Sequence, residues 1–240
     1  IILAAGRGSR MGNMTDERSK CLVELNQRPL LEWQLGALKA AGIHDVTIVT
    51  GYKKEKLEGR GVSTLFNPEW STSNMVVSLL CAASLFDEPT IVSYSDIIYD
   101  ASIVRRLIDA PEELSVVYDT AWLELWQRRS DSPLNDAESF SIDESGRILD
   151  IGLRVDTVEK IMGQYLGLLK IEPSAMRWIV ELVDKNPGIR DALDMTALLS
   201  RLLGEGRLIY GVQIKGGWCE VDNESDLEVA ESLVREGKLR

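Results

Sequence analysis

The residues with the clearest chemical meaning lie near the start of the chain. Gly6, Gly8 and Gly12 follow a short apolar run, and Arg10 and Lys20 supply positive charge around them. Glycines let the backbone turn tightly and bring its N–H groups close to an anion, while a lysine ammonium can meet charge that develops during phosphoryl transfer. The pattern predicts a loop that binds the phosphates of a nucleotide. A turn without a ligand is the alternative that the glycine spacing by itself leaves open.

The glycine spacing differs from two widespread phosphate-binding motifs. In the string Gly-x-Gly-x-x-x-Gly the third glycine is misplaced for the dinucleotide fingerprint. No Gly-Lys-Ser or Gly-Lys-Thr follows, as a P-loop requires. The loop therefore indicates a different class of nucleotide site.

Two aspartates are candidate metal ligands. Asp96 directly follows a β-branched run, and Asp222 lies just before the last predicted helix. Ligands of parallel sheets bind at the carboxyl ends of strands, where Gly6 and Asp96 both fall. Reactions at nucleotide phosphates depend on neutralising charge, and Mg²⁺ held by one or two carboxylates is the usual means. Helix capping is the alternative for Asp96, whereas Asn223 and Asp226 already have the spacing of a capping box beside Asp222.

Strand and helix patterns alternate around these residues through the first half of the chain. Strands are predicted at 1–5, 46–50, 62–66 and 90–94, and helices at 30–41, 53–57 and 73–85. This alternation predicts an α/β fold with a mostly parallel sheet. In the second half, helices are predicted at 100–109, 174–185, 195–205 and 224–237, strands at 114–119, 164–171 and 207–214, and a hairpin at 140–151. Residues 122–138 show no clear periodicity, so we expect a polar segment there.

Length and composition limit the organisation of the protein. The 240 residues contain no evident repeat or linker, and we expect a single domain, 1–240, with a nucleotide-binding half at 1–100 and a half at 101–240 that carries the substrate site and the second aspartate. The net charge of −11 disfavours binding to nucleic acid or to anionic membranes. Three scattered cysteines and no apolar run of membrane-spanning length predict a cytoplasmic protein without disulfides. Because the chain opens inside a predicted strand, we expect the natural protein to begin before Ile1.

Longer strings of this sequence resemble one enzyme family. The strings are Leu-Ala-Ala-Gly-x-Gly-Ser-Arg-Met-Gly at 3–12, Ser-Lys-Cys-Leu-Val at 19–23, Glu-Val-Asp-x-x-x-Asp-Leu at 220–227, and residues 67–79 and 163–168. They resemble the CTP:phosphocholine cytidylyltransferase group, with its phosphonate-handling relatives, and the resemblance covers nearly the whole chain. It implies a GT-A-like, Rossmann-like nucleotidyltransferase fold with a mostly parallel mixed central sheet.

The resemblance also implies a reaction and a set of residues. The enzyme would use Mg²⁺ and transfer CMP from CTP to a small phosphate or phosphonate, with release of pyrophosphate. Lys20 would contact the α-phosphate, while Asp96 and Asp222 would hold the metal. Nucleotide contacts are expected from Leu3, Ala4, Ala5, Gly6, Gly8, Ser9, Arg10, Lys20 and Asn74. Helix capping is an equal alternative for Asn74. Family members usually carry Pro-Lys where this chain has Ser-Lys at 19–20, and we expect this change to loosen the loop.

The acceptor stays open among phosphocholine, 2-aminoethylphosphonate and a hydroxyalkylphosphonate. Aromatic rings form cages around quaternary ammonium groups, carboxylates can hold an ammonium, and an arginine can bind a phosphate. We therefore expect the acceptor site among Trp122, Arg129, Asp136, Glu138, Tyr165 and Trp218. Core packing is the alternative for the aromatic residues, and a solvated loop is the alternative for the charged ones.

Two other functions share parts of this pattern. A sugar-1-phosphate nucleotidyltransferase has the same opening loop, but its pocket is expected to present groups that bind hydroxyls. A nucleotide-sensing subunit without catalysis has no need of Lys20, Asp96 and Asp222 together. The sequence thus favours an enzyme whose partners are CTP and a small acceptor, with no nucleic acid or membrane, and it leaves a homodimer open.

Overall fold

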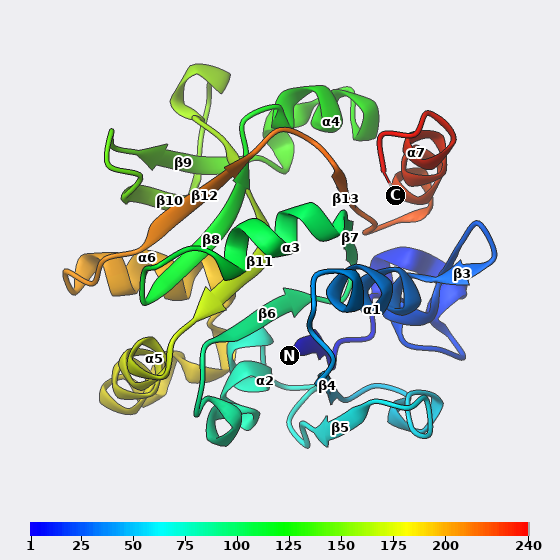
Figure 1. Ribbon diagram of the computed structural model, residues 1–240, viewed down its shortest axis with the longest axis horizontal. Helices are drawn as coiled ribbons and strands as arrows, with labels where there is room; N and C mark the ends of the chain where they lie inside the picture. The colour runs from blue at the N-terminus through cyan, green and yellow to red at the C-terminus, as the bar shows by residue number, and fades with distance from the viewer. Residues whose placement is uncertain (240) are drawn as a thin grey trace.

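Apolar and β-branched runs form the strands of a seven-stranded central sheet in the computed structural model, which describes residues 1–239 (Figure 1). Its strands are β12 (Tyr210–Ile214), β8 (Leu114–Asp119), β11 (Gln164–Ile171), β6 (Thr90–Tyr94), β1 (Ile2–Ala4), β4 (Thr47–Thr50) and β5 (Ser63–Phe66), in spatial order. Only β11 runs antiparallel to its neighbours. The mostly parallel mixed sheet predicted from the alternating pattern is confirmed.

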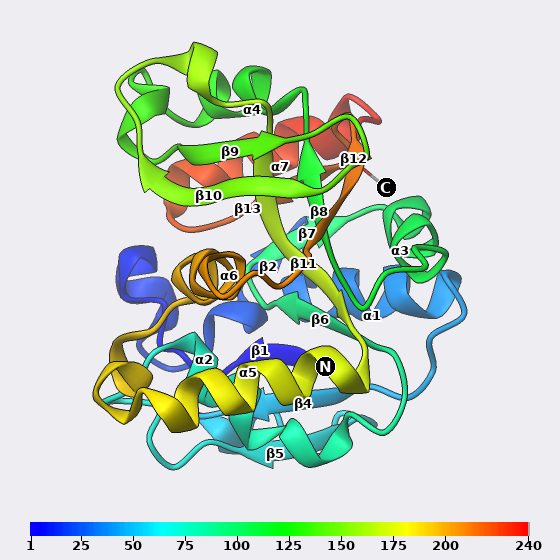
Figure 2. The same ribbon diagram turned by 90° about the vertical axis from the view of Figure 1, so that its left-hand side faces the viewer.

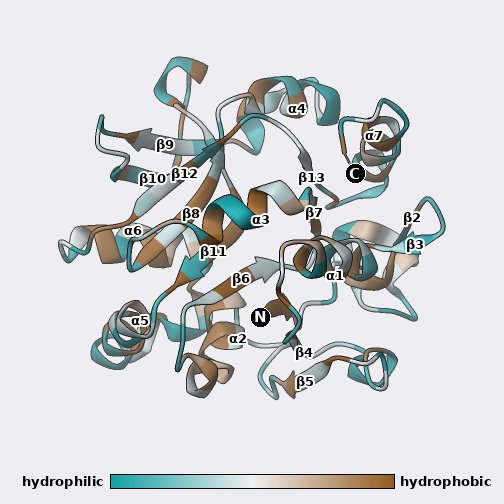
Figure 3. Ribbon diagram, in the orientation of Figure 1, coloured by the Kyte–Doolittle hydropathy of each residue, from teal (hydrophilic) through white to brown (hydrophobic). Residues whose placement is uncertain are grey.

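Helices cover both faces of this sheet, as Figures 1 and 2 show. They are α1 (Leu30–Ala40), α2 (Met75–Cys81), α3 (Ala101–Ile108), α4 (Trp122–Arg129), α5 (Pro173–Lys185), α6 (Met195–Gly204) and α7 (Glu224–Arg235). One hydrophobic core contains residues of α1, α3, α4 and α7, and the other contains residues of α2, α5 and α6. Successive residues of β1 alternate between the two cores, because strand side chains point to opposite faces: Ile2 lies in the first core and Leu3 in the second. In Figure 3 the ribbon of β8, one of the central strands, is accordingly coloured as hydrophobic over much of its length.

The carboxyl ends of β1 and β6 lie side by side, because these strands are parallel neighbours that pair Ile2 with Ser93 and Leu3 with Tyr94. Gly6 follows β1 and Asp96 follows β6, so both residues emerge at the same edge of the sheet. This is the edge at which α/β folds bind their ligands.

Three two-stranded antiparallel sheets accompany the central sheet, and one of them pairs β2 (Glu24–Leu25) with β3 (Arg28–Pro29). β7 (Ile97–Tyr99) pairs with β13 (Trp218–Glu220), and β9 (Glu138–Ile142) pairs with β10 (Ile148–Arg154). The β9–β10 hairpin was predicted, whereas β7 and β13 were not. Just beyond β13, the Val221 N–H donates to the Asp96 carbonyl at 2.8 Å. This bond ties together the two chain segments that carry the predicted metal aspartates.

The prediction of an aperiodic segment at 122–138 is wrong over its first half, which forms α4. Trp122, Leu125, Trp126 and Arg129 are spaced as one helical face, and the three apolar side chains are buried. The pattern was hidden because a charged arginine occupies the fourth position of this face. Across residues 1–239, none of the helices has the length and apolar character needed to span a membrane.

Candidate active site

The glycine loop leads from β1 into a short 3-10 helix, η1 (Ser9–Thr15). Gly8 has a φ of 71° and Gly12 a φ of 55°, values in the left-handed region that favours glycine. The buried Thr15 hydroxyl donates to the Gly8 carbonyl at 3.2 Å and lies 3.3 Å from the Gly12 carbonyl. The side chain of Thr15 thereby links the two glycine turns of the loop.

Lys20 lies at the centre of the site. Its side chain is buried, and its ammonium donates to the Asp96 Oδ2 at 2.8 Å and to Asp222 Oδ1. The other carboxylate oxygen of Asp222 pairs with the exposed Arg10 guanidinium at 2.8 Å. The structure therefore brings together four residues that were predicted from distant parts of the sequence.

The charges in this cluster stabilise one another. Burial alone would lower the pKa of Lys20, but the carboxylates of Asp96 and Asp222 outweigh burial and raise it. Burial alone would raise the pKa of Asp222, but the Lys20 ammonium, with help from Arg10, lowers it. Lysine and carboxylate are therefore both ionised at neutral pH, as a site for polyphosphate and metal needs.

Glu220, for which no role was predicted from the sequence, joins the two aspartates. Ligand atoms of Asp96, Glu220 and Asp222 lie within 4.8 Å of one another. The pKa of Glu220 is raised to about 8, by burial first and by the Asp222 carboxylate second. The signal was present in the string Glu-Val-Asp, because residues two apart in an extended segment point to the same side.

This set of carboxylates fits a hard divalent cation. Carboxylate oxygens are the ligands that Mg²⁺ prefers, and Oδ1 of Asp96 is buried without a hydrogen-bond partner among the described residues. A buried acceptor without a donor is costly, and a metal ion at this place would satisfy it. Asp96, Asp222 and Glu220 are thus the residues that could hold Mg²⁺.

Ser19 anchors the chain just before Lys20. Its hydroxyl donates to the Tyr52 carbonyl at 2.6 Å, and its φ of −64° is a value that proline also adopts. The expectation that serine loosens this loop is therefore wrong. The hydrogen bond to the Tyr52 carbonyl restrains the chain just before Lys20.

A pocket of about 130 Å³ lies between the glycine loop and the start of α2. Four predicted nucleotide residues line it, namely Leu3, Ala5, Gly6 and Asn74, together with Trp70, Ser73, Met75 and Ser78. Ala4 is buried in the core, while Ser9 is exposed at the start of η1. No role was predicted for Trp70, although this residue belongs to the string at 67–79.

Asn74 uses its side chain to hold the wall of this pocket. Its Oδ1 accepts from the Met75 N–H at 2.7 Å at the start of α2, and its amide donates to the Ala192 carbonyl at 3.3 Å. Its own N–H donates to the Asp191 carbonyl at 2.7 Å. The structure thus places Asn74 in the capping role that the sequence left open, beside the pocket rather than free within it.

Acidic side chains gather on the other side of the aspartates. Burial raises the pKa of both Asp136 and Glu138. The carboxylate of Asp222 raises the pKa of Asp136 further, and the carboxylate of Asp194 raises the pKa of Glu138 further. Glu138 begins β9, where Gln164 fixes its backbone with hydrogen bonds of 2.6 and 3.1 Å. Asp136 and Glu138 therefore belong to an acidic region in which a neighbouring positive charge would favour the ionised form of each carboxyl group.

The tryptophans predicted for the acceptor site lie in the core instead. Trp122, Trp126 and Trp218 are each at most 5% exposed and pack on one another, with ring centroids 5.9 Å apart in both pairs. Tyr165 packs edge-on against Tyr94, with ring centroids 5.9 Å apart. The tryptophan rings pack against one another and are buried, so the three tryptophans are not arranged as a cage around a cation.

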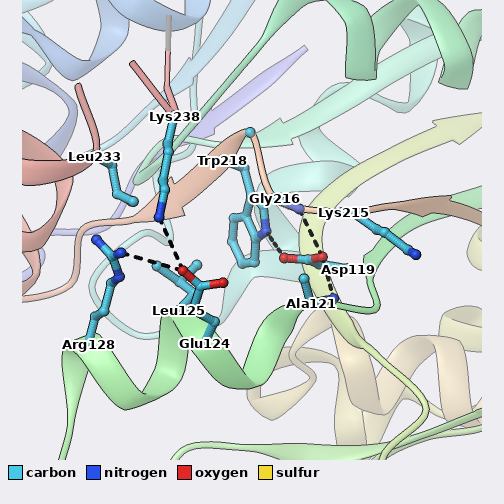
Figure 4. A pocket seen from close by; sticks show the side chains of 11 residues that line it. Asp119, Ala121, Glu124, Leu125, Arg128, Lys215, Gly216, Trp218, Leu233 and Lys238 are labelled. Atoms are coloured by element: carbon cyan, nitrogen blue, oxygen red, sulfur yellow. Dashed lines mark hydrogen bonds and ion pairs between the residues drawn. The ribbon is translucent and has the colours of Figure 1, made fainter. Parts of the chain in front are cut away.

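Trp218 also lines a separate pocket of about 270 Å³, seen in Figure 4. Its indole N–H donates to Asp119 Oδ2 at 2.9 Å, and Glu124 receives ion pairs from Arg128 and Lys238 at the opposite wall. None of its lining residues belongs to the glycine loop or to the three clustered carboxylates. The pocket beside Trp218 is therefore separate from the predicted site.

Arg129 is enclosed by protein groups. Only 6% of its side chain is exposed, and it pairs with Asp226 at 2.8 Å, with Glu220 at 3.0 Å and, more distantly, with Asp136 at 3.9 Å. The prediction that Arg129 grips the acceptor phosphate therefore conflicts with the structure, because carboxylates already surround its guanidinium.

The chain is similar to known proteins over most of its length. Residues 1–149 match the MobA-like NTP transferase domain family. The chain is 34% identical to the CTP:phosphoglutamine cytidylyltransferase of Campylobacter jejuni, over 95% of this chain and 97% of that protein. It is 30% identical to the 2-aminoethylphosphonate cytidylyltransferase of Lancefieldella rimae, over 63% of this chain and 59% of that protein. The solved CTP:phosphocholine cytidylyltransferase of Streptococcus pneumoniae has the same fold, with a TM-score of 0.74 and 22% identity over 97% of both chains.

Proposed function

Because the chain belongs to the MobA-like NTP transferase domain family, we propose that it is a cytidylyltransferase that moves CMP from CTP to a small phosphate or phosphonate. The relative from Campylobacter jejuni, which aligns along almost its whole length, supports CTP as the donor. Pyrophosphate is the second product. The two halves, 1–100 and 101–240, act as one domain in this proposal, because both contribute strands to the central sheet.

The observation that carries the proposal is the meeting of Lys20, Asp96 and Asp222 at the carboxyl edge of the sheet. The pocket beside Gly6 and Asn74 is the place for the base and ribose. A triphosphate that follows the glycine loop from this pocket runs toward the Lys20 ammonium. This order of parts suits attack at the α-phosphorus, with the β- and γ-phosphates as leaving group.

Each residue has a distinct role in the transfer. The Gly8 turn lets the triphosphate approach the backbone, and Arg10 balances its charge from the exposed side. Lys20 stabilises the negative charge that grows on the α-phosphate oxygens. Asp96 and Asp222, with Glu220, would hold Mg²⁺, which when bound neutralises phosphate charge. The acceptor oxyanion attacks directly, so the reaction needs no general base.

The acceptor is proposed to carry an ammonium group. Asp136 and Glu138 form an acidic region beside Asp222, and a cationic group on the acceptor would compensate it. The buried tryptophans favour an ammonium that donates N–H bonds over a quaternary one. Phosphoglutamine, which has an α-ammonium, and 2-aminoethylphosphonate therefore fit this region better than phosphocholine or a hydroxyalkylphosphonate.

The proposal is tested by pyrophosphate release from CTP, UTP, ATP and GTP, each with phosphoglutamine, 2-aminoethylphosphonate, phosphocholine, hydroxyethylphosphonate and glucose 1-phosphate. We expect release with CTP and an ammonium-bearing acceptor, in the presence of Mg²⁺. Release only with glucose 1-phosphate would instead assign a sugar-1-phosphate nucleotidyltransferase. Binding of CTP without release from any pair would favour a nucleotide-sensing subunit.

A further inference from the structure

We propose that Arg129 is a positioning residue, which fixes Asp222 and Glu220 in place for the metal and touches neither nucleotide nor acceptor. This inference rests on the proposed function. It replaces the role in phosphate binding that the sequence suggested for Arg129. The guanidinium of Arg129 pairs with Asp226 and with Glu220, which lie on either side of Asp222 in the sequence.

The first contact is a two-point ion pair with Asp226. Arg129 Nε lies 2.8 Å from Asp226 Oδ1, and Nη2 lies 3.2 Å from Oδ2. Parallel N–H bonds from the planar guanidinium fix both distance and orientation, which a single ammonium contact does not do. Asp226 is 1% exposed, so water screens this pair very little.

The second step leads from Asp226 to the metal aspartate. Asp226 Oδ2 accepts from the Asp222 N–H at 2.9 Å and from the Asn223 N–H at 3.3 Å. Asn223 returns a hydrogen bond by accepting from the Asp226 N–H at 3.0 Å, which completes a capping box at the start of α7. One carboxylate therefore joins the guanidinium of Arg129 to the backbone of Asp222.

A separate contact of the guanidinium reaches the other end of the same segment. Arg129 Nη1 lies 3.0 Å from Glu220 Oε2, and the guanidinium stacks over the ring of Trp126 at 5.0 Å. Arg129 thus spans from Glu220 to Asp226 across the residues that carry the metal ligands. Groups of this kind, one layer behind the ligands, set ligand orientation and tune metal affinity.

Replacement by lysine separates positioning from charge. Arg129→Lys keeps the positive charge near the carboxylates but loses the two-point contact with Asp226. Arg128→Lys is the matched control, because Arg128 is the adjacent residue of α4 and, within residues 1–239, its ion pairs are with Glu124 and Glu236 at the surface. Any general effect of an arginine-to-lysine change in this helix appears in both variants.

Each purified variant is titrated with Tb³⁺, a lanthanide ion that binds oxygen ligands. Binding is followed by the luminescence of Tb³⁺ after excitation of the protein's tryptophans. We expect Arg129→Lys to bind Tb³⁺ about 10-fold more weakly than the wild type and to need correspondingly more Mg²⁺ for half-maximal pyrophosphate release, with Arg128→Lys unchanged. A wild-type Tb³⁺ titration for Arg129→Lys overturns the proposal. So does an increase in acceptor KM without a change in metal affinity, the result expected from phosphate binding.

Two further measurements keep the test decisive. Circular dichroism and thermal unfolding establish that the variants are folded, and Asp226→Asn, which retains an oxygen for the Asp222 N–H, replaces Arg129→Lys if the latter is unfolded. Asp226→Asn is expected to weaken Tb³⁺ binding as well, and unaltered binding counts against the proposal. The Tb³⁺ titration requires no turnover, so it remains interpretable even if every acceptor proves inactive and the proposed function fails.

Discussion

The side chain of Lys20 packs directly against the bare Cα of Gly8. A Cβ added to Gly8 would lie 2.7 Å from the Cβ of Lys20, and Gly8 has a φ of 71°. Glycine is therefore required here for two reasons, the backbone conformation and the close approach of the lysine stem. The turn of the glycine loop and the position of the Lys20 ammonium between Asp96 and Asp222 depend on each other.

This contact predicts the effect of Gly8→Ala. The new methyl group displaces the stem of Lys20, and we expect kcat/KM to fall about 100-fold, the cost of moving a reacting group by roughly 1 Å. Gly12→Ala is the control, because Gly12 also has a positive φ but has open space around it. Equal losses in both variants would attribute the effect to backbone strain instead of the contact with Lys20.

Removal of the lysine charge separates catalysis from stability. In Lys20→Met the turnover should be lost, and without metal the fold should lose about 3 kcal/mol, because the partners Asp96 and Asp222 remain as uncompensated buried charge. Added Mg²⁺ should raise the melting temperature of the variant more than that of the wild type, since metal then supplies the missing countercharge. Thermal unfolding with EDTA and with Mg²⁺ tests this. A smaller gain in the variant would show that Lys20 and the metal do not share the carboxylates.

The parts of the site that could be predicted from the sequence are those whose pattern lies within a few consecutive residues. The strand of β1, the glycine turns and the strand before Asp96 each occupy a few consecutive residues, and the sheet brings their ends together because parallel strands share an edge. Glu220 could also have been predicted, from its spacing with Asp222 in an extended segment.

The roles of the larger side chains depend on tertiary packing and could not be predicted in this way. Tryptophan is a residue type that forms cages around cations. Only the packing of α4 against β13 in the folded protein places the rings of Trp126 and Trp218 against each other. Arg129 has the type of a phosphate ligand, and only its distance from Asp226 and Glu220 reveals a structural role. These contacts join residues that are 91 or more positions apart.

The buried tryptophans predict how methylation of the acceptor affects the rate. The series consists of phosphoethanolamine, its N-methyl and N,N-dimethyl derivatives, and phosphocholine. Each added methyl group removes one N–H donor that could hydrogen-bond to the carboxylates of Asp136 or Glu138. We expect kcat/KM with CTP to fall along the series, measured by pyrophosphate release. A rate that rises toward phosphocholine would require an aromatic cage and contradict the interpretation of the tryptophan cluster.

The three cysteines should differ sharply in reactivity. Cys21 and Cys219 are fully buried, and burial raises the pKa of each thiol to about 12, whereas Cys81 is partly exposed. Because the thiolate is the reactive form, we expect one fast-reacting cysteine in the native protein at pH 8 with a disulfide reagent such as DTNB, and three after denaturation. Peptide mapping should identify Cys81. Fast modification of Cys21 would contradict the packing beside Lys20.

We expect Glu138 to lower the stability of the fold near neutral pH and to contribute to acceptor binding. Burial, and then the Asp194 carboxylate, raise the pKa of Glu138 in the folded protein. The folded state therefore holds a proton that the unfolded chain loses near pH 4.5, so this residue makes stability fall as the pH rises from the unfolded value through the folded one. Glu138→Gln removes this pH-dependent loss of stability. The free energy of unfolding of the variant, relative to the wild type, should therefore rise between pH 4 and pH 7, while KM for an ammonium-bearing acceptor increases.

Urea unfolding across this pH range measures the change in stability, with Glu144→Gln in the exposed turn of the hairpin as control. A variant that is less stable than the wild type at pH 7, or that keeps the acceptor KM, would show that Glu138 serves the fold instead of the acceptor.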